Sequence, residues 1–219
     1  ATRRQVAAYL GLPRHSTELY TPVAEEELVK IGEVAQFLAH SDVGNRLNLA
    51  QRTRLAAQCG QRLCRPGDAI VHASDAGTDL YIIQFGTVEV WKDPEGIDPA
   101  MHEHAQMQHI TTFRPGQIVG ELAMLDQGAR TADLIAGGEG ATVLTLNRER
   151  LLTLCEDDAV LGTQLLWNIA TVMSRRVRFI LWQLNRAEQK RLLHNQPDPN
   201  ETILSPILVN RPASTAARQ

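Results

Sequence analysis

A glycine, an acid and an arginine in the middle of the chain could together hold a sugar phosphate. Gly120 is followed by Glu121, and Arg130 lies nine residues after that acid, across a short turn. Glycine opens backbone conformations that are closed to other residues, and segment 121–125 can form one helical turn whose free N–H groups point at an anion. The Arg130 guanidinium can return to the same anion, and the Thr131 hydroxyl can add a contact.

The carboxylate of Glu121 restricts which anions could bind in this segment. A carboxylate beside a phosphate is repelled unless the ligand also offers hydroxyl donors, and a ribose phosphate carries both groups. Glu121 and Arg130 therefore predict a ribose phosphate site. The alternative interpretation is an ion pair between these two side chains, inside a domain that binds no ligand.

Composition and charge are those of an ordinary globular protein. Hydrophobic residues make up 43% of the 219 residues, and the formal charge of −3 gives no global attraction to nucleic acid. The longest uncharged run, 159–174, contains Gln164 and Asn168 and is shorter than the roughly 20 apolar residues of a bilayer span. We expect a buried helix there and no membrane partner. The first residues show no export signal, and the three cysteines lack paired or metal-type spacing, so we expect a cytoplasmic protein.

The elements that must position this site begin with helices. Residues 1–24 hold two prolines among polar residues, which indicates a loose arm with one short helix near 5–10. From 24 to 39 the apolar residues recur three and four positions apart, the spacing of one buried helical face. A second helix is expected over 49–58.

The chain then changes to short β-type runs separated by glycine-bearing turns. The expected strands cover 69–72, 80–85, 88–91, 108–113 and 141–146, with a long connection over 93–103. Many short strands with frequent turns are typical of a sandwich or barrel. We expect an α+β, mainly β fold, namely a jelly-roll-like β-barrel with flanking N-terminal helices and a long C-terminal helix.

A helix over 148–155, capped by Asn147, should lead into one roughly 35-residue helix that ends near Leu193. At 1.5 Å per residue that helix is about 50 Å long, more than a single barrel needs for cover. One face can pack on the barrel through Leu165, Ile169 and Val172. Another forms a coiled-coil seam of Leu166, Ala170, Met173, Val177, Ile180, Leu184 and Ala187. The expected parts of the chain are 1–47 (arm and helix), 48–157 (β-barrel), 158–194 (long dimerisation and lid helix) and 195–219 (disordered tail).

The segment around Gly120 resembles the phosphate-binding cassette of the cyclic-nucleotide-binding domain found in the catabolite activator family, protein kinase regulatory subunits and nucleotide-gated channels. Three further segments resemble that family in order: Arg65-Pro66-Gly67-Asp68, the hairpin 79–90 around Gly86, and the approach 115–121. The resemblance covers about residues 48–190. It implies a receptor for cAMP or cGMP.

The resemblance also implies roles for individual residues. Glu121 would hold the ribose 2′-hydroxyl and Arg130 would neutralise the cyclic phosphate. Thr131 would allow both nucleotides, because a hydroxyl there can contact phosphate or a guanine amino group. In the long helix, Ile180, Leu181 or Trp182 would cover the base. The implied ligand-binding residues are Val119, Gly120, Glu121, Leu122, Ala123, Arg130, Thr131, Ala132, Ile180, Leu181 and Trp182.

One residue departs from the family pattern, and two other classes of protein stay as alternatives. Asp133 adds a negative charge just after the cassette, which would weaken anion binding if its side chain turned inward. A DNA-binding regulator of the catabolite activator type is disfavoured because a proline-rich tail follows Leu193. A metal-dependent cupin would use His102, Glu103, His104 and His109, but these residues lie in or beside a proline-rich loop.

The prediction is therefore a cytoplasmic receptor without metal and without enzymatic activity. No nucleophile elbow or catalytic triad can be picked out, and Arg175, Arg176 and Arg178 indicate a solvated helix face rather than a DNA contact. We expect a homodimer formed through the long helix and no direct DNA binding. Ligand-dependent movement of that helix should pass the signal to an unidentified effector protein.

Overall fold

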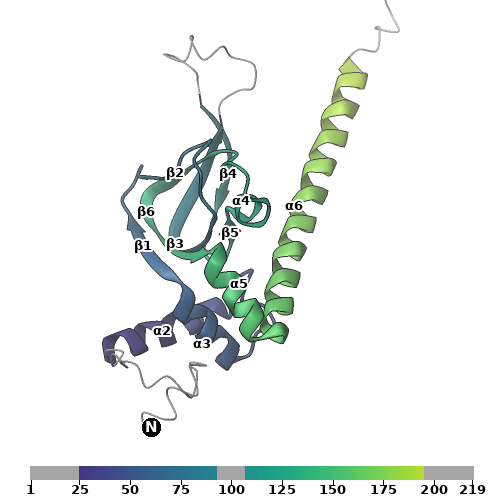
Figure 1. The fold of residues 1–219 in the computed structure, drawn as a ribbon. Helices are drawn as coiled ribbons and strands as arrows, with labels where there is room; N and C mark the ends of the chain where they lie inside the picture. The colour runs from purple at the N-terminus through teal and green to yellow at the C-terminus, as the bar shows by residue number, and fades with distance from the viewer. Residues whose placement is uncertain (1–24, 93–106, 195–219) are drawn as a thin grey trace, which may run out of the picture. The chain divides into compact units, whose positions relative to one another are not determined.

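The computed structural model describes residues 25–92 and 107–194 of the chain (Figure 1). The chain divides into two compact units, residues 1–173 and 174–219. Several predictions fall outside the described residues. They concern the arm, the helix near 5–10, the connection 93–103, the tail and His102 to His104. Within the described ranges no helix is long and apolar enough to cross a membrane.

Two helices precede the sheet where the sequence pattern predicts them. α2 covers Glu25–Leu38 and buries Val34, Ala35 and Leu38 on one face. α3 covers Leu49–Gln58 and begins in a capping box with Asn48, whose side chain accepts from the Gln51 N–H at 2.9 Å. Because a capping box satisfies two backbone donors that the helix leaves unpaired, it fixes where α3 begins.

An antiparallel sheet follows, with two long central strands. Its strands are β1 (Gly60–Cys64), β2 (Ala69–Val71), β3 (Asp79–Lys92), β4 (Gln108–Phe113), β5 (Ile118–Val119) and β6 (Asp133–Asn147). The order along the main path is β1-β6-β3-β4, while β2 also pairs with β6 and β5 with β3 (Figure 1). This confirms the predicted mainly β fold with flanking helices. The ladder is open, because the strands at the two ends of the path, β1 and β4, are not paired with each other in the described residues.

The two central strands are longer than the sequence predicts. β3 joins the two expected runs 80–85 and 88–91, and β6 contains the expected run 141–146 only in its last part. Gly86 and Gly140 explain the difference, because both have positive φ where β3 and β6 approach closely. A Cβ at Gly86 would lie 2.0 Å from the Gly140 carbonyl oxygen. Both glycines permit close strand contact, and at Gly86 this contact stands where the sequence suggested a turn.

Two helices close the described part of the first unit and carry the chain into the second. α5 covers Arg148–Asp157 after Asn147, whose side chain accepts from the Glu149 N–H at 2.7 Å. α6 covers Ala159–His194, which confirms one long helix. Its first half is packed on the apolar core, where the predicted flank of Leu165, Ile169 and Val172 is buried together with Leu161.

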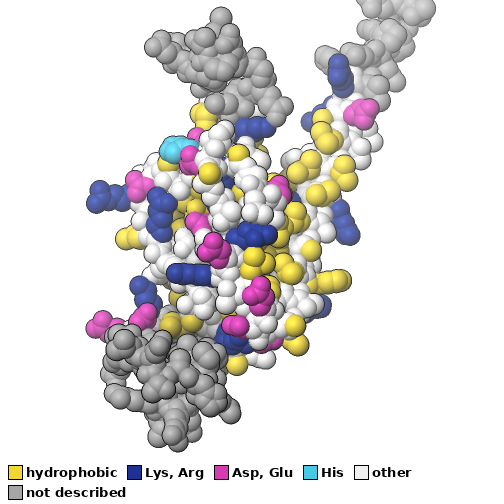
Figure 2. Space-filling view, in the orientation of Figure 1, with side chains coloured by type: hydrophobic (Ala, Val, Ile, Leu, Met, Phe, Trp, Pro, Cys, Tyr) yellow, Lys and Arg dark blue, Asp and Glu magenta, His cyan; other side chains and the backbone are white. Residues whose placement is uncertain are grey.

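The second unit contains the rest of α6, where every described side chain from Val177 to Arg191 is exposed. Val177 is 54% exposed and Leu184 is 60% exposed. Both hydrophobic and basic side chains are exposed on this part of the helix (Figure 2). The predicted seam is therefore exposed in the single chain from Val177 onward, whereas its earlier member Met173 is half-buried against the core.

Two alanine substitutions separate the cost of backbone strain from that of strand contact. Gly67 and Gly86 have φ of 81° and 71°, but only at Gly86 does a Cβ meet other atoms within 4 Å. We expect Gly67→Ala to lower the free energy of unfolding by about 1 kcal/mol, because of strain alone, and Gly86→Ala by about 3 kcal/mol. Urea denaturation measures both. Equal losses would show that β3 and β6 do not approach as described.

Candidate functional site

The predicted cassette forms a turn between β5 and β6. Gly120 has φ of 87° and ends β5, and α4 follows at once over Glu121–Asp126. The first intrahelical bond runs from the Met124 N–H to the Gly120 carbonyl at 3.2 Å. The N–H groups of Leu122 and Ala123 thus lie in the first helical turn, which leaves them without partners inside the helix. The expected helical turn over 121–125 is confirmed.

Glycine is the only residue type that fits at position 120, between β5 and α4. Its φ lies in the left-handed region, and a Cβ would lie 2.7 Å from Arg130 Nη1 and 2.9 Å from the Asp79 carbonyl oxygen. Any side chain would therefore displace the arginine that faces it.

Arg130 is a buried cation held by backbone carbonyls. Its exposed fraction is 7%. Nη1 donates to the Gly120 carbonyl at 3.2 Å, and Nη2 donates to the Asp79 carbonyl at 2.9 Å. The guanidinium carbon lies 5.4 Å from the centre of the Tyr81 ring. These contacts fix the plane of the guanidinium at the start of α4.

One donor of this guanidinium has no partner. Arg130 Nε is the single buried side-chain nitrogen or oxygen in the described residues that makes no hydrogen bond. A buried unpaired donor costs free energy, and an anion accepting from it would recover that cost. Burial raises the pKa of Tyr81, against a smaller lowering by Arg130, so the neighbouring phenol stays neutral and does not offset the charge.

The other predicted cassette residues surround this arginine in different environments. Glu121 is 5% exposed and begins α4, where the helix dipole favours an acid. Val119 and Ala123 are buried, Ala132 is half-buried, and Leu122 and Thr131 are exposed. Ile180, Leu181 and Trp182 belong to the second unit.

Asp133 takes part in a contact that the sequence did not indicate. Its Oδ1 accepts from the Ala73 N–H at 2.5 Å and lies 4.0 Å from His72 Nδ1. The carboxylate thus holds the loop after β2. That loop also bonds the Arg130 backbone, through Asp75 and Ser74.

Sequence reasoning missed Asp79 and Tyr81. Asp79 contributes only its carbonyl oxygen, which any residue has, so no side-chain pattern marks it. Tyr81 reaches the site because it is paired with Val119 in the sheet. The pairing register of two distant strands cannot be read from the sequence, so Tyr81 could not be assigned to the site in advance.

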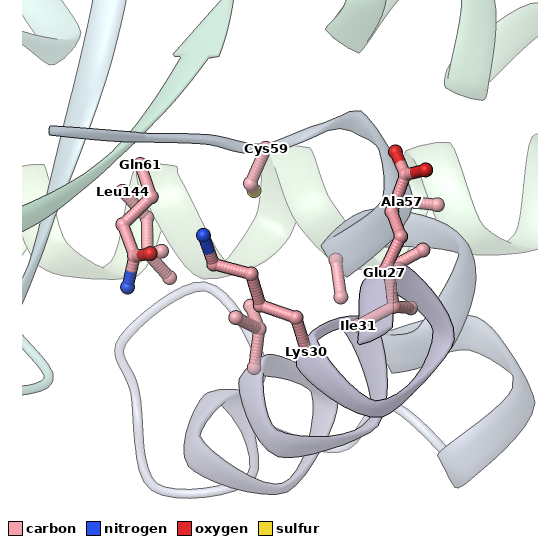
Figure 3. A pocket seen from close by; sticks show the side chains of 9 residues that line it. Glu27, Lys30, Ile31, Ala57, Cys59, Gln61 and Leu144 are labelled. Atoms are coloured by element: carbon pink, nitrogen blue, oxygen red, sulfur yellow. The ribbon is translucent and has the colours of Figure 1, made fainter. Parts of the chain in front are cut away.

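A separate cavity of about 220 Å³ lies between α2, α3 and the start of β1 (Figure 3). Lys30, Glu27 and Gln61 line it together with apolar side chains of the core, and no cassette residue is among its lining. Within the described ranges, no group of three His, Cys, Asp or Glu residues could hold a metal. His109 contacts Trp91 and Thr112.

Comparison with protein families and with known proteins gives consistent matches. Residues 61–158 match the family model of the cyclic nucleotide-binding domain. The chain is 34% identical to cyclic nucleotide-gated channel beta-3 of Mus musculus over 89 residues, which are 39% of this chain and 11% of the channel. It is 29% identical to the cyclic AMP receptor protein of Thermus thermophilus over 118 residues, covering 54% of this chain and 49% of that protein.

Solved structures show the same fold. The catabolite activator protein of Thermus thermophilus superimposes with a TM-score of 0.58 at 24% identity, over 68% of this chain and 63% of that one. A cyclic nucleotide-binding domain from Methylobacillus flagellatus gives 0.59 at 18% identity, over 78% of this chain and 88% of that one. The chain covers less than half the length of the channel and of the receptor protein named above.

The contact between Arg130 and Tyr81 can be tested by titrating the phenol. Because burial raises the Tyr81 pKa and the Arg130 charge lowers it, we expect Arg130→Met to move the Tyr81 ionisation to still higher pH. Absorbance at 295 nm, taken as the difference from a matching Tyr81→Phe variant, isolates this tyrosine. An unchanged or lower pKa in Arg130→Met would contradict the described geometry.

Proposed function

We propose that the chain, whose residues 61–158 match the family model of the cyclic nucleotide-binding domain, is a receptor for cAMP or cGMP that signals to a partner protein. The observation that carries the proposal is the buried Arg130, whose Nε has no partner beside the first turn of α4. A cyclic phosphate supplies the acceptor that this donor lacks. The proposal assigns ligand binding to the chain and no chemical step.

Different cassette residues are proposed to contact different groups of the nucleotide. Arg130 neutralises the phosphate through Nε, while its two bonds to carbonyls keep the guanidinium in place. The first N–H groups of α4, at Leu122 and Ala123, complete the anion site. Glu121 accepts from the ribose 2′-hydroxyl. Gly120, Val119 and Ala132 form the surrounding backbone.

The residues proposed for the purine are Thr131 and one of Ile180, Leu181 and Trp182. Three consecutive helical residues point about 100° apart, so Ile180, Leu181 and Trp182 cannot all face one base. Trp182 is already stacked on Phe179, with ring centres 6.1 Å apart, and has Arg186 over its ring at 5.2 Å. The Thr131 hydroxyl suits both cAMP and cGMP. The relatives likewise include a protein named for cyclic AMP and a cGMP-dependent protein kinase.

The proposed output is carried by α6. Its exposed seam, which includes Val177, Ile180 and Leu184, supports pairing of two copies, because pairing would remove this apolar surface from water. Residues 174–194 also carry six Lys and Arg against one Glu, a formal charge of +5. That charge favours an effector with an acidic surface.

Calorimetric titration with cAMP and with cGMP tests the ligand. We expect Arg130→Ala to weaken binding of the preferred nucleotide by about 100-fold and Glu121→Gln by about tenfold, because each loses a contact to a charged group. Arg62→Ala is the matched control, since Arg62 also donates to two carbonyls but is exposed. Binding that is absent in the wild type, or equal in all variants, would refute the site.

Sedimentation velocity tests self-pairing through α6. We expect a dimer for the wild type and a monomer for the double variant Ile180→Glu/Leu184→Glu, because charges in a coiled-coil seam stay unpaired and buried. Gln189→Glu introduces an acid on the side of the helix that faces away from the seam and should remain dimeric. A wild-type monomer would remove the seam from the proposal.

A further inference from the structure

Asn168 is a buried amide on the first half of α6 that bonds to one loop. It is 4% exposed. Its Nδ2 donates to the Val43 carbonyl at 2.8 Å and to the Asn45 carbonyl at 2.7 Å, and its Oδ1 accepts from Gln164 Nε2 at 2.8 Å. Both amide hydrogens and the oxygen are therefore used. Unlike the apolar contacts around it, this pair of bonds fixes one position of the helix along the loop.

The loop that Asn168 holds, residues 39–47, has little freedom of its own. Ser41 Oγ donates to the Leu38 carbonyl at 2.9 Å and accepts from the Gly44 N–H at 3.1 Å. A Cβ at Gly44 would lie 1.8 Å from the Leu38 carbonyl oxygen, so the chain turns tightly against the end of α2. A displacement at one side of this loop is passed to the other side.

The other side of loop 39–47 meets the turn that leads into the cassette. The Asp42 N–H donates to the Gly116 carbonyl at 2.7 Å. A Cβ at Gly116 would lie 2.8 Å from the His40 carbonyl oxygen, so the two backbones are in direct contact. Gly116 stands four residues before Gly120, with only β5 and one residue between them.

The start of α6 is fastened to a different element. Asp158 Oδ1 accepts from the N–H groups of Val160 and Leu161, at 3.1 and 3.0 Å, and its Oδ2 bonds Arg54 of α3 at 2.7 Å. α6 is thus anchored on α3 at its first turn and on loop 39–47 ten residues after Asp158. Movement of the loop relative to α3 would tilt the helix.

We propose that Asn168 is the positioning residue that couples nucleotide binding at the cassette to the position of α6, an inference that rests on the proposed function. Ligand at the first turn of α4 shifts β5 and the Gly116 turn, the turn shifts loop 39–47, and Asn168 carries that shift into the helix. Leucines at the same contact would pack as well but could slide, because apolar packing is not directional.

Hydrogen exchange of α6 residues 174–191 in the full chain, with and without cAMP, tests the coupling. We expect a cAMP-dependent difference in the wild type that falls about fivefold or more in Asn168→Leu, while the variant still binds cAMP. Leu165→Ala is the control, because it loses buried apolar contacts on the same helix but leaves the Asn168 side chain and its two carbonyl partners in place. It should keep the wild-type difference.

Several outcomes would overturn the role of Asn168. One is an unchanged difference in Asn168→Leu, and another is an equal loss in Leu165→Ala, which would indicate mere destabilisation. If Asn168→Leu does not fold, Asn168→Ser, which is too short to reach both carbonyls, is measured under the same criteria.

A second experiment, carried out without ligand, distinguishes a failure of this proposal from a failure of the proposed function. Gly116→Ala presses on the His40 carbonyl, so it should change α6 exchange in the wild-type background and leave it unchanged in Asn168→Leu. If no nucleotide binds but this dependence is seen, the receptor function fails and the mechanical link stands. If Gly116→Ala acts equally in both backgrounds, the link fails.

Discussion

The candidate site depends on one buried guanidinium surrounded by backbone carbonyls. Arg130 donates to carbonyls of Gly120 and Asp79, and these bonds join β3, the end of β5 and the turn before β6. A charge in such surroundings is costly unless every donor is used. The structure satisfies two nitrogens and leaves Nε without a partner, so the protein fold supplies orientation and a ligand would supply the missing acceptor.

This arrangement separates rigid parts of the chain from an exposed part. The Gly116 turn that leads into the cassette bonds the backbone of loop 39–47, and that loop bonds the Asn168 side chain of α6, so each of these segments has little freedom. The second half of α6 shows only exposed side chains from Val177 to Arg191. In the proposed coupling, a binding event at the cassette is therefore read out by whatever packs against the exposed half of α6.

Local features of this chain could be predicted from sequence, and pairings between distant segments could not. α3 follows its capping residue Asn48, and Gly120 adopts a conformation that only glycine favours, so both follow from nearby residues. The contact between Arg130 and Tyr81 depends on sheet register instead. Asn168 looked like a polar interruption of an apolar run, because its partners are backbone carbonyls more than 120 positions away.

The sheet topology also sets an order of assembly during synthesis. β6 is the last strand, yet β1, β2 and β3 all pair with it, and its partners include Asp79 opposite Asn147. β1 thus meets its partner only after β2 to β5 have been made, since Gly60 pairs with Thr145, and such long-range pairing is slow. Arg130 lies three residues before the first residue of β6, so the proposed phosphate site is among the last features of the domain to take shape as the chain leaves the ribosome.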